Sequence, residues 1–183
     1  METTNATTHT SPNQNQQVEQ QIEEAPTQIE IFSHGSCIGN PGSGGWGYNI
    51  HRSTREGTII KRSEGKGQAR QTTNIQTEIT AACEALQKLG RVTDEPILVY
   101  SNLKLISDVM NERLAGWKAN GWKKDNGKAV KNRDLWERLE SAAAGRTIDW
   151  KWLPRDHSSA HSERAKQLAT DAARRAEKRW AAR

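Results

Sequence analysis

The stretch that decides the fold is IEIFSHGSCIGNPGSGG, residues 29–45. Its first part predicts a β-strand, and its second part is rich in glycine and proline, which is typical of a turn. His34 stands where the two parts meet. A polar residue at the end of a strand, before a glycine-rich loop, is often a functional one. His34 is therefore the first candidate for a functional residue.

The start of this stretch and the residues after it predict three short strands in hairpin spacing, over residues 28–33, 45–52 and 57–65. The period then changes over residues 73–90, where apolar residues recur every three or four positions and predict a helix that stops at Gly90 (Ile75, Ile79, Ala82, Leu86 and Leu89). Further strands are expected over 95–101 and 147–154, and further helices over 103–114, over 133–145 and at the C-terminus. Three strands followed by alternating helices and strands indicate an α/β fold with a mixed sheet.

Composition restricts the partners of the chain. The 183 residues fit one domain, and a net charge of +5 with a pI near 9.4 favours a polyanionic partner, nucleic acid first. Cys37 and Cys83 form no metal-ligand pattern, which indicates free thiols in a reducing compartment and predicts a cytoplasmic protein. No apolar run approaches the roughly 18 residues that span a membrane, so a membrane is not an expected partner.

The chain divides into three predicted parts. Residues 1–26 are polar, lack a secretory signal and predict a disordered N-terminal tail. Residues 27–173 form the predicted folded domain, and residues 174–183 form the basic end of the C-terminal helix. The cations of that end predict either a second basic face or an ordinary solvated surface (Arg174, Arg175, Lys178, Arg179 and Arg183).

Four long motifs follow one another: FSHGSCIGNPGSGGWG (32–47), QTTNIQTEITAACEAL (71–86), GWKANGWKKDNGKAVKNRDLW (116–136) and WKWLPRDHSSAHSERAKQLA (150–169). Together they resemble the type 1 ribonuclease H family, close to the bacterial enzyme, over residues 28–173. The resemblance implies a ribonuclease H-like fold, in which helices flank a five-stranded mixed sheet. It also implies an enzyme that cuts the RNA strand of an RNA–DNA hybrid with two divalent metal ions, usually magnesium.

The resemblance places the four metal-binding carboxylates of the family at His34, Glu78, Asn102 and Lys166, and only Glu78 is a carboxylate. Magnesium prefers oxygen ligands, and two close ions need several negative charges to balance them. We therefore expect no working catalytic residue, no metal ligand set and no cofactor. In place of the metal ions, Lys166 is expected to form an ion pair with Glu78.

Two alternatives keep a catalytic site. The mobile histidine of the family falls at Asp156, with His157 one residue further on, so a small loop shift would let His157 serve. A rebuilt site could use His34 and Glu78 with Asp156 or His161, because imidazole and carboxylate ligands suit zinc or manganese. In general, an active RNA–DNA hybrid ribonuclease with an altered metal site would use magnesium or manganese.

The substrate-binding residues of the family are better kept. The resemblance assigns nucleic-acid contacts to Asn40 in the turn and to Thr73 and Asn74 before the first helix, and Lys104 stands where the family has a glutamine that contacts substrate. It assigns the remaining contacts to a basic protrusion that grips the DNA strand (Trp117, Lys118, Trp122, Lys123 and Lys124). Lysines there would neutralise phosphates. The alternative is that the tryptophans pack the protrusion and the lysines are merely solvated.

These observations predict a catalytically inactive ribonuclease H-like protein that binds RNA–DNA hybrid or other nucleic acid, alone or within a protein complex. One alternative is an active hybrid endoribonuclease with an altered metal site. The other is a protein-interaction module in which the cleft is vestigial.

Overall fold

The computed structural model describes residues 27–157 and 159–181. The predicted tail, residues 1–26, lies outside the described residues. The strands are β1 (Thr27–Gly39), β2 (Gly42–Thr54), β3 (Ile59–Thr72), β4 (Ile97–Ser101) and β5 (Ile148–Trp152). The helices are α2 (Asn74–Lys88), α3 (Lys104–Asp108), α4 (Leu114–Ala119), α5 (Arg133–Ala143) and α6 (Ala160–Ala181), with a π-helical turn over Val109–Arg113 and a 3₁₀ turn over Arg155–His157.

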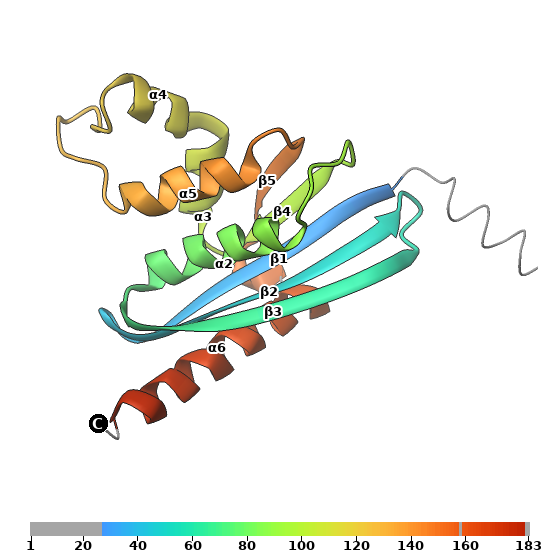
Figure 1. Cartoon of the computed structure of the whole chain (residues 1–183), viewed down its shortest axis with the longest axis horizontal. Helices are drawn as coiled ribbons and strands as arrows, with labels where there is room; N and C mark the ends of the chain where they lie inside the picture. The colour runs from blue at the N-terminus through green and yellow to red at the C-terminus, as the bar shows by residue number, and fades with distance from the viewer. Residues whose placement is uncertain (1–26, 158, 182–183) are drawn as a thin grey trace, which may run out of the picture.

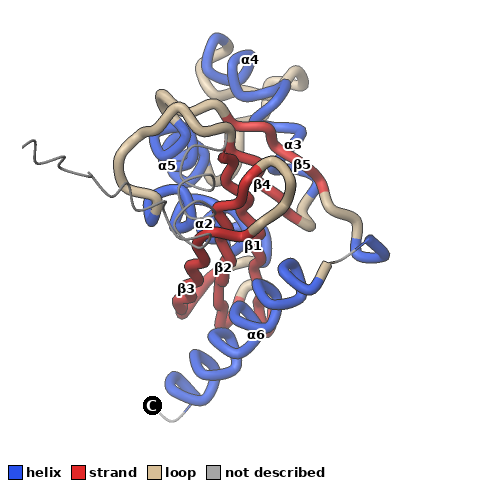
Figure 2. Tube along the Cα trace, turned by 90° about the vertical axis from the view of Figure 1, so that its right-hand side faces the viewer, coloured by secondary structure: helices blue, strands red, loops and turns tan. Residues whose placement is uncertain are grey.

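The strands form one mixed sheet in the order β3-β2-β1-β4-β5. β1, β2 and β3 pair antiparallel, whereas β4 runs parallel to β1 and β5 runs parallel to β4. Helix α2, with α5 beside it, lies on one face of the sheet and α6 on the other, while α3 and α4 lie near β4 and β5 (Figures 1 and 2). The predicted five-stranded mixed sheet with flanking helices is confirmed.

The first strand is longer than expected. β1 pairs with β2 without interruption from Thr27↔Thr54 to Gly39↔Gly42, and His34 lies opposite Gly47 inside this ladder. The prediction that a turn follows His34 was therefore wrong: the turn comes after Gly39. Glycines remain in the strand because the neighbouring strand supplies their backbone hydrogen bonds, which the local sequence does not reveal.

Helix α2 begins and ends as predicted. The Thr73 hydroxyl accepts from the Gln76 amide at 3.3 Å, the Gln76 side chain accepts from the Thr73 amide at 2.9 Å, and Gly90 after the helix has a positive φ of 71°. The apolar face expected on α2 is buried at Ile79 and Leu86. Ile75 is the exception, with 38% of its surface exposed, because the first turn reaches past the core and borders a cavity.

Helix α6 packs unusually close to β2. A Cβ atom at Gly45 would lie 2.3 Å from the Ala173 amide nitrogen, and one at Gly47 would lie 2.7 Å from the Ala165 carbonyl oxygen. Glycine on the strand and alanine on the helix allow this approach (Ala165, Ala169, Ala172, Ala173 and Ala176). The close packing holds the first turns of α6 beside the middle of β1.

Helix α6 runs from Ala160 to Ala181 without a break, so the basic segment from residue 174 continues the helix that packs on the sheet. The helix expected over residues 103–114 is divided into α3, the π-helical turn and the start of α4. In the described part of the chain, no helix combines the length and the apolar character that crossing a membrane requires.

Candidate functional site

A pocket of about 260 Å³, here called the central pocket, opens where β1, α2, the end of β4 and α6 meet. Its lining comes from segments far apart in the sequence (His34, Gly35, Ser36, Cys37, Asn74, Asn102, Glu163, Lys166 and Thr170). His34, Asn102 and Lys166 thus share one pocket. Glu78 lies beneath them, because it pairs with His34.

The floor of the central pocket is an imidazole–carboxylate pair. His34 Nδ1 lies 3.3 Å from Glu78 Oε1 and 2.7 Å from the carbonyl oxygen of Gly35, and only 2% of Glu78 is exposed. Gly35 makes this possible, since a Cβ atom there would lie 2.4 Å from the Glu78 amide nitrogen. The missing side chain lets α2 rest against β1 and brings the buried carboxylate to the histidine.

The wall of the pocket holds a cation with a different partner from the one expected. Lys166 Nζ lies 3.2 Å from Glu163 Oε2, one turn earlier on α6, and more than half of each side chain is exposed. The structure thus gives Lys166 the partner Glu163, whereas an ion pair with Glu78 was expected. Because Glu163 is three residues away on the same helix, it meets the ammonium group without closing the pocket.

Asn102 links the end of β4 to a neighbouring segment by a hydrogen bond. Its Nδ2 atom donates a hydrogen bond of 2.9 Å to the carbonyl oxygen of Leu153, so the end of β4 is joined to the segment that follows β5. The side chain still borders the central pocket. Its amide nitrogen is thus engaged with the backbone.

The histidine and aspartate candidates of the loop before α6 pair with each other. His157 Nδ1 lies 3.1 Å from Asp156 Oδ1, and both side chains are more than 70% exposed. This hydrogen bond lowers the pKa of Asp156. Neither residue lines the central pocket, so the structure does not bring them to His34.

His161 is also engaged elsewhere. Its ring meets the ring of His51 edge-on at 3.8 Å between centroids and lies 5.6 Å from that of Phe32. The alternative ligand set with His34, Glu78 and His161 is therefore not assembled. Among residues 27–157 and 159–181, no three His, Cys, Asp or Glu side chains gather closely enough to hold a metal ion.

Asn74 lines the central pocket, and Asn40 of the predicted nucleic-acid set is joined to it. The Asn40 side-chain oxygen accepts a hydrogen bond of 3.1 Å from the Asn74 amide, so the turn after β1 is joined to the start of α2. Thr73 beside them caps α2 through its hydroxyl. The structure therefore brings Asn40, Thr73 and Asn74 together, and Asn74 borders the central pocket.

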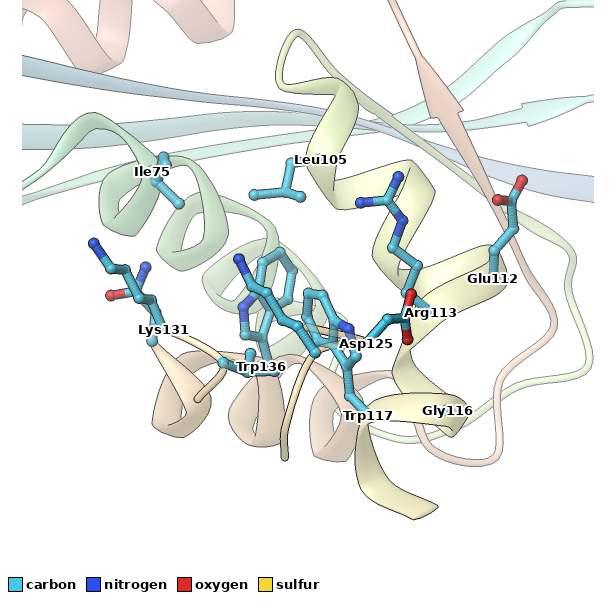
Figure 3. Close-up of a pocket in the computed structure, with 12 residues that line it drawn as sticks. Ile75, Leu105, Glu112, Arg113, Gly116, Trp117, Asp125, Lys131 and Trp136 are labelled. Carbon is cyan, nitrogen blue, oxygen red and sulfur yellow. The ribbon is translucent and has the colours of Figure 1, made fainter. Parts of the chain in front are cut away.

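A larger cavity of about 680 Å³, here called the handle cavity, lies between α2 and the protrusion (Figure 3). Its lining joins apolar and charged side chains (Ile75, Leu105, Glu112, Arg113, Gly116, Trp117, Lys124, Asp125, Val130, Lys131, Asn132 and Trp136). Sequence analysis missed most of these residues. No sequence signal pointed to the cavity, because Ile75 fits the apolar face of the predicted helix. The structure leaves 38% of Ile75 exposed and open space around Gly116.

The tryptophans of the protrusion pack within it. Trp117 meets Trp136 at 6.1 Å with an interplanar angle of 67°, and Trp122 is only 9% exposed beneath the guanidinium group of Arg133 at 5.2 Å. The packing alternative therefore holds for Trp122. Trp117 both packs on the core and borders the handle cavity.

The lysines of the predicted set differ in their partners. Lys118 pairs with Glu140 at 2.6 Å, and Lys104 pairs with Asp108 at 2.6 Å while lying 5.9 Å from the centre of the Trp152 ring. Lys123 and Lys124 are exposed. In the described residues they take part in no ion pair, so these two remain available for phosphates.

Comparison with known proteins agrees with this arrangement. The sequence profile of the RNase H family matches residues 26–174. The ribonuclease H of Francisella tularensis subsp. novicida (strain U112) is 38% identical over 144 residues, which cover 79% of this chain and 90% of that protein. The chain belongs to the ribonuclease H family.

Two solved structures place this ribonuclease H family member among known folds. LC9-RNase H1, a type 1 RNase H with the type 2 active-site motif, is similar with a TM-score of 0.72 and 26% identity, over 87% of this chain and 82% of that one. LC11-RNase H1, solved in complex with RNA/DNA hybrid, shares the fold with a TM-score of 0.59 and 24% identity, over 81% and 99% of the two chains.

Proposed function

We propose that this ribonuclease H family member binds RNA–DNA hybrid or other nucleic acid and does not cleave it. One observation carries the proposal: of the four positions assigned to metal-binding carboxylates by resemblance, only Glu78 has one. That carboxylate is buried and held by His34. The other two positions carry Asn102, tied to Leu153, and the cation Lys166.

The donor set of the central pocket does not fit two magnesium ions. Magnesium needs near-octahedral oxygen ligands, and a pair of ions brings four positive charges. The pocket offers the carboxylates of Glu78 and Glu163, and the ammonium group of Lys166 offsets one of them. Repulsion between this ammonium group and a nearby divalent ion costs several kcal/mol even at an effective dielectric constant of about 20. We therefore derive no hydrolytic step through a metal.

Residues beside the central pocket and on the protrusion support nucleic-acid binding. Asn74 borders the central pocket and Asn40 is hydrogen-bonded to it, so their side-chain amides could meet sugar and base edges. Lys123 and Lys124 extend the surface with exposed cations, and the net charge of +5 favours association with a polyanion. Hybrid duplex is the preferred ligand because the relatives are ribonucleases H.

Binding without cleavage is tested with a labelled hybrid duplex, first in EDTA and then in Mg²⁺ or Mn²⁺. We expect a complex in EDTA that weakens with salt, and an intact RNA strand in either metal. Lys123→Ala with Lys124→Ala should weaken binding and make the salt dependence shallower by roughly 0.9 per lost phosphate contact. Lys178→Ala with Arg179→Ala, which removes the same charge from the far end of α6, is the matched control.

Two outcomes would overturn the proposal. Cleavage that disappears in the Glu78→Gln variant would show an active hydrolase with an altered metal set, since a contaminating nuclease would not respond to that change. Absence of binding at micromolar protein would favour the protein-interaction module. Conversely, the triple change His34→Asp, Asn102→Asp and Lys166→Asp should restore magnesium-dependent cleavage if the missing carboxylates are the whole defect.

A further inference from the structure

A third pocket, here called the basal pocket, lies at the opposite end of β1 from the central pocket. It measures about 300 Å³ and is formed by the ends of three strands and of α2 (Ile29, Ile50, Arg52, Lys61, Arg62, Ser63, Lys88, Leu89, Arg91, Thr93 and Glu95). Ile29 comes five residues before His34, which places the two pockets roughly 17 Å apart along the strand. The basal pocket is thus separate from the proposed hybrid-binding surface.

The basal pocket is strongly cationic. Five of the residues that line it are cationic and one, Glu95, is anionic. Arg62 lies opposite His51 and also borders a pocket on the other face of the sheet, so the cations on the basal side are Arg52, Lys61, Lys88 and Arg91. Glu95 is already paired with Arg52 at 2.6 Å. Within the described residues, no carboxylate lies at ion-pair distance from the remaining basal cations (Lys61, Lys88 and Arg91).

The electrostatic surroundings of these three cations differ. Lys88 ends α2, where the carbonyl end of the helix favours a positive charge. Lys61 lies directly opposite Arg52 on neighbouring strands, and facing like charges destabilise a sheet. A bound anion would remove this repulsion.

The floor of the basal pocket is apolar. Ile29 and Ile50 lie on adjacent strands and are at most 6% exposed, and Leu89 after α2 completes the surface. Ser63 and Thr93 add hydroxyl groups at the rim. An apolar floor with a cationic rim suits a ligand that joins a flat or apolar body to a charged anionic group.

We propose that the basal pocket is a second binding site, for a nucleotide unit. Its phosphates would lie between Lys61 and Arg91, where arginine can bind phosphate with two parallel hydrogen bonds. The base or sugar would cover Ile29, Ile50 and Leu89. The volume of about 300 Å³ matches the lower end of small-ligand sites. A free nucleotide and one unit of a nucleic-acid strand present this same chemistry.

The test uses the full chain with two probes, ADP and a fluorescent single-stranded dT10. Binding is followed by calorimetry for ADP and by fluorescence anisotropy for dT10, and amide chemical shifts locate each probe. Lys61→Gln with Arg91→Gln should weaken ADP binding about 10-fold or more, since hydrogen bonds between charged groups are lost. Lys178→Gln with Arg179→Gln lowers the net charge equally and should leave the affinity unchanged.

The outcomes separate the two sites and the two sources. Shifts of the basal residues with ADP support a free-nucleotide site, and shifts only with dT10 support a site for a strand. If Lys123→Ala with Lys124→Ala abolishes hybrid binding but not ADP binding, the basal pocket acts independently of the proposed hybrid surface. The proposal is overturned if neither probe moves the basal residues, or if both pairs of charge-removing variants weaken binding equally. A thermal melt checks that Lys61→Gln with Arg91→Gln remains folded.

Discussion

The contact between Gly45 and α6 gives the sharpest prediction. In Gly45→Ala, the new methyl carbon would lie 2.3 Å from the Ala173 nitrogen, 2.4 Å from the Ala169 oxygen and 2.7 Å from the Ala172 Cβ. Non-bonded atoms are comfortable at about 3.5 Å. Two of the three atoms belong to the helix backbone, which has no rotamer to change. The whole of α6 must therefore move away from the sheet by about 1 Å.

We expect this overpacking to lower the free energy of unfolding by about 3 kcal/mol, the upper part of the usual range, because backbone atoms are involved. For a chain of this length that corresponds to a fall in melting temperature of roughly 6–12 °C. The displacement should also carry Lys166 outward and widen the central pocket, since Lys166 lies on α6. Hybrid binding in EDTA should change with it.

The assay is urea and thermal unfolding followed by circular dichroism. Gly116→Ala is the matched control: it makes the same chemical change within α4, where no atom lies within 4 Å of the new carbon. It should leave stability unchanged or raise it by about 0.5–1 kcal/mol, because alanine favours a helix over glycine. The packing argument is refuted if Gly45→Ala melts within roughly 2 °C of the wild type while retaining its cooperativity.

Three further predictions follow from single residues. Burial and the adjacent His161 lower the pKa of His51 to about 4. As the pH falls, the unfolded chain therefore protonates this imidazole before the folded protein does, and the free energy of unfolding should fall by up to about 3 kcal/mol between pH 6.5 and pH 4. In urea melts at several pH values, His51→Gln should reduce this pH dependence. Thr73→Ala should cost about 1 kcal/mol of stability through loss of the helix cap, and an unchanged urea midpoint would contradict that role. Burial raises the pKa of Cys83 to about 12. Iodoacetamide should therefore label half-buried Cys37 in the native protein and Cys83 only after unfolding. Two adducts on the native protein, detected by mass spectrometry, would contradict this prediction.

Local signals predicted the parts of the fold that local physics controls. Gly90 predicts the end of α2, and the apolar period before it predicts the buried face. The capping box of Thr73 and Gln76 at the start of α2 is a finding of the structure. The same logic failed for β1, because its ladder with β2 extends through Gly35 and Gly39, residues that signal a turn when read alone. The handle cavity was missed for a similar reason, since Ile75 and Trp136 line one cavity only when α2 and α5 pack together.

The sequence by itself determined the family and the residue types at the four positions of the central pocket, because these depend only on long motifs in register. Only the tertiary structure decided how those residues pair. Gly35 allows α2 to rest on β1, which joins His34 to Glu78, while the geometry of α6 gives Lys166 to Glu163. Which charges are neighbours is set by the three-dimensional packing of distant segments, and neighbouring charges decide what the pocket can bind.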